Sequence, residues 1–269
     1  MPLHTIESRR LYRQIADQIR AGIHAGEYPA GSRLPAERDL AQQLGVSRPS
    51  VREALIALEV EGLVDVRVGS GVHVLDGTAA ARSGRRLGNA CGPFEIMHAR
   101  RVVEGELAAI AARRMTRSQL AGLRAVLGTM AADIAAGHMP LLGDRQFHLR
   151  VAEAADNGPL LRTVTELYDE RNNPLFETFG QHFESERTWR LALAEHEAVV
   201  EAIAARNAEA ARQAMQRHLQ RSQHRYAHIA VDAIDAPAAT PRLASAPPPQ
   251  ARGGALHEHR MTRARSAAR

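Results

Sequence analysis

Residues 34–62, LPAERDLAQQLGVSRPSVREALIALEVEG, carry the signals of two helices joined by a tight turn. The first helix is predicted over Ala36–Leu44, and Gly45 follows it as the turn residue. Ser47 is a good N-cap for the second helix, because its hydroxyl can accept a hydrogen bond from the first turn, where Pro49 is tolerated. This spacing is typical of a helix–turn–helix.

The flanking sequence completes a small domain. Upstream, apolar residues recur at every fourth position from Leu11 to Ile23, which indicates an amphipathic helix. Downstream, residues 63–67 and 72–75 alternate between apolar and polar and are joined by a glycine-rich turn, which predicts a β-hairpin. Residues 5–76 are therefore expected to form a winged helix–turn–helix of the α/β class.

The remainder of the chain differs in character. Residues 94–230 show helical periodicity with short loops and no convincing strand, so they predict an all-α bundle of six or seven helices. The glycine-rich residues 77–93 are interpreted as a linker. Residues 231–269 hold too few apolar side chains to offset the entropy of ordering them, and are predicted to be a disordered tail.

Composition limits the possible functions of the 269 residues. The net charge is +5, but residues 1–76 carry −1 and residues 94–230 carry zero, so the excess lies in the linker and tail and says little about DNA binding. The single cysteine, Cys91, excludes a disulfide framework and a multi-thiolate metal site. Neither a signal peptide nor an apolar run long enough to span a membrane is present, and a cytoplasmic protein is expected.

The start of the second helix of the helix–turn–helix is a candidate DNA-reading surface. Arg48 and Arg52 are spaced i,i+4 on the side away from the apolar positions, and arginine can contact guanine O6 and N7 in the major groove. Ser47 and Ser50 could donate to phosphates beside them. The alternative is a solvated face in which the arginines pair with nearby acids.

Four polar residues fall on inward-facing lines of the predicted bundle. Asp144 and His148 are one helical turn apart, whereas His196 and His218 come from two further helices. Burying such groups costs several kcal/mol unless a partner satisfies them. One divalent cation would satisfy all four, although their identity does not select the metal. The alternative is a set of hydrogen-bonded core histidines.

Residues 11–75 resemble the winged-helix domain of GntR-family bacterial transcription regulators, through the string G-x-x-LP-x-ER-x-LA-x-x-LGVSR-x-x-VREAL. The resemblance implies that Arg38, Arg48 and Arg52 contact operator DNA, with Arg33 nearby. It also implies a wing glycine near the minor groove, which Gly69 matches.

Residues 94–230 resemble the FCD effector domain of the FadR-like branch of this family, through HARRVVEGELAAIAA, DRQFHLRVAEAADN and EHEAVVEAIAARNAEAARQAMQRHL. In that domain an aspartate and three histidines hold a metal, which carries over to Asp144, His148, His196 and His218. Zinc is the first choice for this metal, with nickel, manganese or iron as alternatives. Arg100 matches an arginine that pairs with the effector's carboxylate, and its alternative partner is Glu104, one turn further on.

We therefore expect a transcription regulator, of the repressor type, that binds an inverted-repeat operator as a homodimer and senses a small organic acid. An enzyme is not expected. One alternative is a metal-dependent hydrolase, since a His3Asp site with open positions could activate water. The other alternative keeps the DNA-binding domain but makes the bundle a metal sensor or a metal-free dimerisation module.

Overall fold

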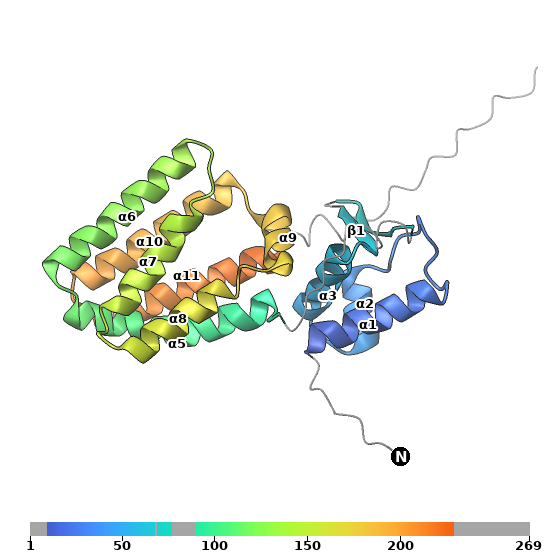
Figure 1. The fold of residues 1–269 in the computed structure, drawn as a ribbon, viewed down its shortest axis with the longest axis horizontal. Helices are drawn as coiled ribbons and strands as arrows, with labels where there is room; N and C mark the ends of the chain where they lie inside the picture. Colours follow the sequence, from blue (N-terminus) through green and yellow to red (C-terminus); the bar gives the residue numbers. More distant parts are fainter. Residues whose placement is uncertain (1–9, 68, 77–89, 229–269) are drawn as a thin grey trace, which may run out of the picture. The chain divides into compact units, whose positions relative to one another are not determined.

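The computed structural model describes residues 10–67, 69–76 and 90–228 (Figure 1). Most of the predicted linker, residues 77–89, and the whole predicted tail, residues 231–269, lie outside the described residues. Among the described helices, none is both long and apolar enough to cross a membrane.

The N-terminal part has the predicted order of three helices followed by a hairpin, which confirms the winged helix–turn–helix. Its elements are α1 Leu11–His24, α2 Glu37–Leu44, α3 Arg48–Val60, β1 Val64–Arg67 and β2 Gly71–Val74. Gly45 ends α2 in the left-handed conformation, with φ 65°, and Ser47 caps α3 by accepting from the Ser50 amide at 3.3 Å. The turn glycine and the N-cap serine are therefore found at the positions that the sequence predicts.

The core of this part is built from one face of each helix and the inner face of the hairpin. α3 packs against α1, α2 and β1. Ile15 and Ile19 of α1, Leu55 and Leu58 of α3, and Val72 of β2 are all buried. Each such side chain contributes roughly 1.5–3 kcal/mol by leaving water.

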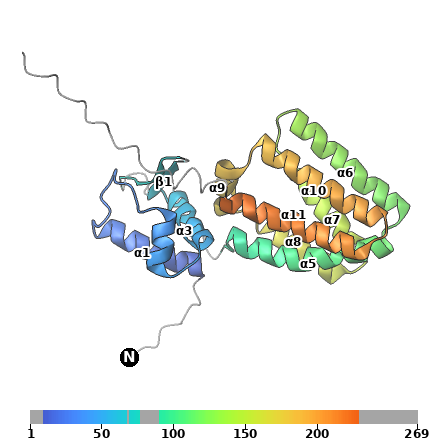
Figure 2. The ribbon, with the colours of Figure 1, turned by 180° about the vertical axis from the view of Figure 1, so that it is seen from behind.

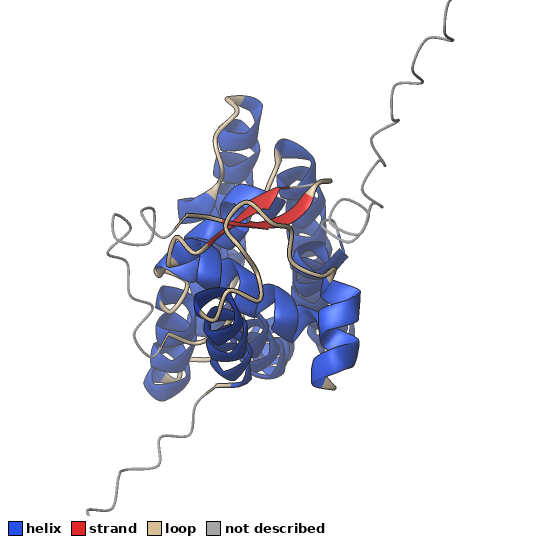
Figure 3. Ribbon diagram, turned by 90° about the vertical axis from the view of Figure 1, so that its right-hand side faces the viewer, coloured by secondary structure: helices blue, strands red, loops and turns tan. Residues whose placement is uncertain are grey.

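The wing contains one backbone pairing that the sequence pattern does not predict. β1 and β2 are antiparallel, with Val64 opposite Val74 (Figure 3), and residues 31–34 pair along the other edge of β2. The Leu34 amide donates to the Val72 carbonyl at 2.8 Å, and the Gly31 amide donates to the Val74 carbonyl at 2.8 Å. The extra segment fixes the wing to the loop that precedes α2.

The C-terminal part is all helical within the described residues, which confirms the predicted bundle. Its seven helices are α5 Pro93–Arg114, α6 Arg117–Ala135, α7 Leu141–Glu153, α8 Gly158–Asp169, α9 Pro174–Phe183, α10 Glu186–Ala204 and α11 Ala208–His228. α11 runs beside α5 and α10 in both views (Figures 1 and 2). α6 and α7 pack together, and α7 also contacts α5 and α8.

Helix boundaries in the bundle follow local capping chemistry. Thr116 and Ser185 each form a capping box at the start of α6 and α10, and Asn157 and Asn173 cap α8 and α9. These side chains satisfy backbone amides that a helix leaves open at its start. The caps therefore set where α8, α9 and α10 begin, and with them the helix connections that line the site described below.

Candidate functional site

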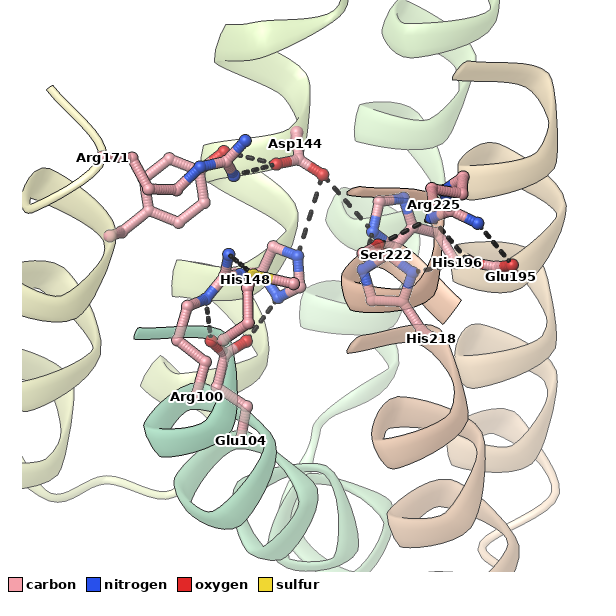
Figure 4. Close-up of polar contacts among 12 residues, drawn as sticks. Arg100, Glu104, Asp144, His148, Arg171, Glu195, His196, His218, Ser222 and Arg225 are labelled. Atoms are coloured by element: carbon pink, nitrogen blue, oxygen red, sulfur yellow. Dashed lines mark hydrogen bonds and ion pairs between the residues drawn. The ribbon is translucent and has the colours of Figure 1, made fainter. Parts of the chain in front are cut away.

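The four predicted metal ligands converge in the bundle (Figure 4). Asp144 and His148 lie on α7, His196 on α10 and His218 on α11. One ligand atom from each lies within 4.8 Å of all the others. All three histidines are buried. The prediction that these side chains share one point is confirmed, and the residues form a candidate cation site.

The distances among the ligand atoms suit a metal ion. His196 Nε2 lies 3.1 Å from His218 Nε2, and Asp144 Oδ1 lies 3.5 Å from His196 Nε2 and 3.8 Å from His148 Nε2. Zinc–nitrogen bonds of ~2.0–2.1 Å place neighbouring ligands of a tetrahedral or octahedral centre roughly 2.9–3.4 Å apart. The closest pair already has this spacing, whereas the more widely separated ligand atoms, up to 4.8 Å apart, would have to move together for one cation to bind all four.

A second layer of side chains orients these ligands. Glu104 of α5 pairs with His148 Nδ1, and Glu195 Oε2 lies 3.0 Å from His218 Nδ1. The outer oxygen of Asp144 accepts from the Tyr168 hydroxyl and, at 3.0 Å, from Arg171 Nη1. A carboxylate on Nδ1 leaves Nε2 of the ring as the lone-pair donor, which is the arrangement of histidine ligands in metal sites.

Some buried ring nitrogens of the candidate site have no hydrogen-bond partner in the protein. Among the described residues, His148 Nε2 and His196 Nδ1 are buried without a hydrogen-bond partner. His148 Nε2 faces the shared point, where a cation would satisfy it. Phe147 packs against the His196 ring, with centroids 4.1 Å apart, and helps to hold that ring in place.

The electrostatics keep two of the imidazoles neutral. Burial, together with the neighbouring His218, holds the pKa of His196 well below its ordinary value, and burial also lowers the pKa of His218. Burial opposes ionisation of Asp144, but its contacts with His148 and Arg171 outweigh this and hold its pKa well below the ordinary value. These directions favour neutral imidazoles at His196 and His218 and an ionised carboxylate at Asp144, which are metal-binding forms. Burial opposes protonation of His148, but the Glu104 carboxylate outweighs this and raises the pKa of His148.

Arg100 is buried, with 1% of its surface exposed, and its Nε donates to Glu104 Oε1 at 2.6 Å. The alternative pairing with Glu104 is therefore present. The pairing leaves Arg100 Nη2 buried without a partner among the described residues. Arg100 also lines a cavity of about 70 Å³, together with Asp144, His148 and His218. One guanidinium can thus hold Glu104 and still offer a donor to a ligand.

Sequence reasoning missed several residues of the cavity wall. Arg171 lies in the connection between α8 and α9, stacks 4.8 Å from the Tyr168 ring and reaches Asp144. Arg225 binds Glu195 through both terminal nitrogens, at 2.9 and 3.1 Å. Arg171 lies in a turn without periodicity, so its sequence carries no signal. Arg225 sits seven residues after His218 on the same helix, a spacing that could have identified it.

The candidate DNA-reading side chains lie at the start of α3 and in its surroundings. Ser47 is exposed, Arg48 and Ser50 are half-buried, and Arg38 is 71% exposed beside Asp39. Arg33 packs over Gly71 of the wing, where an added Cβ would meet its Nε at 2.2 Å. Gly69 is exposed at the turn of the wing, with φ 80°.

The side chain of Arg52 is buried and does not lie on the expected exposed face, whereas its contact with DNA stays a prediction. Its Nε donates to Glu37 Oε1 at 2.8 Å, a second nitrogen pairs with the other oxygen, and the side chain is 1% exposed. The i,i+4 spacing puts Arg52 one turn after Arg48. The first turn of α2 places the Glu37 carboxylate against that position, and the bidentate pair turns the guanidinium inward.

Comparison with known proteins agrees with both parts. Residues 11–74 match bacterial regulatory proteins of the gntR family, and residues 95–221 match the FCD domain. The Uxu operon transcriptional regulator of Escherichia coli is 35% identical over 224 residues, which are 81% of this chain and 87% of the relative. The chain belongs to the GntR family.

Two further relatives within this family are similar over comparable lengths. The Exu regulon transcriptional regulator of Escherichia coli is 36% identical over 80% of this chain and 83% of its own length. The Uxu operon regulator of Haemophilus influenzae is 32% identical over 78% and 80%. The family and these relatives are transcription regulators, so this GntR-family chain is a DNA-binding transcription regulator with an FCD domain, and not an enzyme.

Proposed function

We propose that this regulator is a repressor whose FCD domain senses a small carboxylate through a bound divalent metal ion. The observation that carries the proposal is the convergence of Asp144, His148, His196 and His218 within 4.8 Å, next to the unpartnered nitrogen of Arg100. The protein would act in the cytoplasm, where its DNA target lies.

The two features have complementary roles toward an organic acid. A five- or six-coordinate cation held by one carboxylate and three imidazoles keeps one or two positions open, which a carboxylate oxygen of the effector can occupy. Arg100 Nη2 can donate a charge-assisted hydrogen bond to the same carboxylate. Zinc is the first candidate for the metal, and nickel, manganese and iron are compatible with the same ligands.

For operator binding we assign base contacts to Arg48 and Arg38, at the start of α3 and in the first turn of α2. Ser47 and Ser50 are placed to donate to phosphates, and Arg33 and Gly69 belong to the wing, which would approach the minor groove. Arg52 is assigned a supporting role, since its pair with Glu37 joins α2 to α3. DNA contact by Arg52 would require that this pair opens.

A homodimer on an inverted repeat follows from the size of the reading unit. One winged helix reads only a short half-site, so two copies are needed for a specific operator. The effector would relieve repression if it bound one arrangement of the bundle more tightly than the other, because only differential affinity shifts such an equilibrium.

The first experiment is a metal and effector titration. Wild type, His196→Ala and the control His138→Ala, which removes an exposed histidine of the α6–α7 connection, are stripped of metal and titrated with zinc. We expect one tight zinc per chain in wild type and in His138→Ala, and a loss of at least about tenfold in affinity in His196→Ala. Organic acids should then raise the melting temperature of wild type and of His138→Ala after zinc loading, and leave that of His196→Ala unchanged.

Two results would contradict the proposal. Equal zinc affinity in all three proteins would exclude the candidate ligands. Zinc binding without any response to acids would favour the metal-sensor alternative.

A further inference from the structure

A larger cavity adjoins the one beside the candidate cation site. The inner cavity, which Asp144 and His148 line, has a volume of about 70 Å³, and the outer cavity has about 810 Å³. Six residues line both cavities and form their shared boundary: Met139, Leu141, Arg171, Glu184, Trp189 and Tyr226.

The boundary between the two cavities is one side chain thick. Arg171 Nη1 donates to Asp144 Oδ2 at 3.0 Å in the inner cavity, and the same guanidinium lies 6.0 Å from the Phe176 ring of the outer cavity. Leu141, also in the boundary, is 53% exposed. Because exposed side chains change rotamer freely, Leu141 can turn aside for a ligand that extends from one cavity into the other.

The inner cavity is too small for more than a short acid. One water molecule takes roughly 10–15 Å³ of such a volume, so about 70 Å³ holds about five to seven groups of that size. A carboxylate with two further carbon atoms, as in propanoate, nearly fills it. The remaining atoms of any longer acid that binds at the candidate cation site would therefore have to lie in the outer cavity.

The lining of the outer cavity is mainly apolar and aromatic. Tyr168, Phe176 and the only tryptophan of the chain, Trp189, contribute rings. Leu141 and Leu142 begin α7 at its rim, and Leu142 is 76% exposed. Exposed apolar side chains beside a cavity are typical of a ligand-binding groove. A carbon chain packed against this lining would remove apolar surface of both partners from water.

Charged side chains of the outer cavity are compensated within the protein. Arg145 pairs with Asp169 at 3.0 Å, as Arg171 does with Asp144. Glu184 accepts from the Tyr226 hydroxyl at 2.8 Å and from Trp189 Nε1 at 3.1 Å. These groups need no countercharge from a ligand, so apolar contact is the interaction that the outer cavity offers.

We propose that the outer cavity is the second half of the effector site, and that it binds the carbon chain of a carboxylate with about six or more carbon atoms. The inference rests on the proposed function, because it assumes that the carboxylate itself binds at the metal and Arg100. Selection for length then comes from the outer cavity, whereas the inner cavity recognises the acid group.

Two glycines allow a matched test in the zinc-loaded full chain. Gly180 of α9 lines the outer cavity, and a Cβ added there would meet no atom within 4 Å. Gly128 of α6 is exposed and equally unobstructed. Gly180→Phe therefore places a ring in the outer cavity, and Gly128→Phe is the control. Calorimetry gives the dissociation constants of propanoate and hexanoate, and circular dichroism checks that each variant is folded.

We expect hexanoate to bind wild type and Gly128→Phe at least about tenfold more tightly than propanoate, since each buried methylene contributes about fourfold. In Gly180→Phe this preference should fall to about threefold or less, with the affinity for propanoate unchanged, because the ring takes the space of the chain.

Three results separate failure of this inference from failure of the proposed function. Equal binding of the two acids by wild type, or an unchanged preference in folded Gly180→Phe, would overturn the role of the outer cavity alone. A change of oligomeric state in Gly180→Phe alone, measured by size-exclusion chromatography, would assign the outer cavity to a second copy of the chain and overturn the inference. Absence of binding by both acids in wild type would overturn the proposed function as well.

Discussion

Glu104 contacts two functional groups of the bundle at once. One oxygen accepts from Arg100, and the other pairs with His148. Although burial alone would raise the pKa of Glu104, the charges of Arg100 and His148 lower it to about 2. The carboxylate is therefore ionised at neutral pH, and it neutralises a buried guanidinium while it orients a metal ligand.

Replacement of Glu104 should destabilise the bundle. In Glu104→Gln, Arg100 stays buried without a countercharge, and we expect a loss of about 3 kcal/mol in the free energy of unfolding. Urea denaturation measures this loss. The control Glu106→Gln removes an exposed acid of the same helix, and its unfolding midpoint should stay near that of wild type. Equal stability of Glu104→Gln and wild type would show that the buried pair does not contribute this free energy of unfolding.

The two arginines of α3 should respond differently to removal. Arg48→Ala is expected to weaken binding to a selected operator by about 10- to 100-fold, the value of one base contact, with the melting temperature nearly unchanged. Arg52→Ala should instead lower the melting temperature, because it removes the bidentate ion pair between Arg52 and the buried carboxylate of Glu37. The exposed residue Arg117 of α6 supplies a control, Arg117→Ala, that should change neither property.

Gel-shift titration and thermal denaturation separate these cases. A loss of operator affinity in Arg52→Ala without a loss of stability would return Arg52 to the DNA-contacting surface. If Arg48→Ala binds the operator as tightly as wild type, the assignment of α3 to the major groove is contradicted.

At the scale of elements, the wing depends on a close approach between Arg33 and Gly71. Gly71 has φ 96°, and a Cβ there would lie 2.2 Å from Arg33 Nε. We expect Gly71→Ala to cost about 1–2 kcal/mol of stability, through backbone strain, and to displace Arg33. Chemical denaturation of Gly71→Ala and of the control Ser70→Ala would measure the difference. Equal stability of the two variants would show that the wing adapts without strain.

The helices could be predicted from sequence because their caps and apolar periodicity are local. Ser47 is predicted as a helix cap, and the structure confirms it. Thr116 and Ser185 cap their helices through the same local chemistry. The pairing of residues 31–34 with β2 could not be predicted, since Pro29, Gly31 and Pro35 favour a loop and the pairing partner is distant in sequence. Side-chain direction at Arg52 was missed for a related reason, because it depends on an acid of another helix.

The candidate site shows the same division between local and distant signals. Asp144 and His148 share a face of one helix, and inward spacing together with the family resemblance places His196 and His218 with them. Arg171 lies in the connection between α8 and α9, and its approach to the cavity depends on the path of that connection. Residues on regular helices could be assigned from sequence, whereas those in turns required the three-dimensional fold.

At the scale of the whole molecule, the chain joins a winged-helix domain to an FCD domain in which a cavity adjoins the candidate cation site. The effector would act on operator binding only as far as its affinity differs between two arrangements of the regulator. The candidate metal ligands are central to the proposed function, because Arg100 gains its proposed role only if a cation anchors the effector's carboxylate at Asp144, His148, His196 and His218.

X-ray absorption at the zinc edge of the zinc-loaded full chain tests that claim most directly. The account predicts three imidazole ligands with zinc–nitrogen distances of about 2.0–2.1 Å, completed by oxygen atoms, and the loss of one imidazole in His218→Ala. A spectrum without imidazole scattering, or one unchanged in His218→Ala, would contradict it.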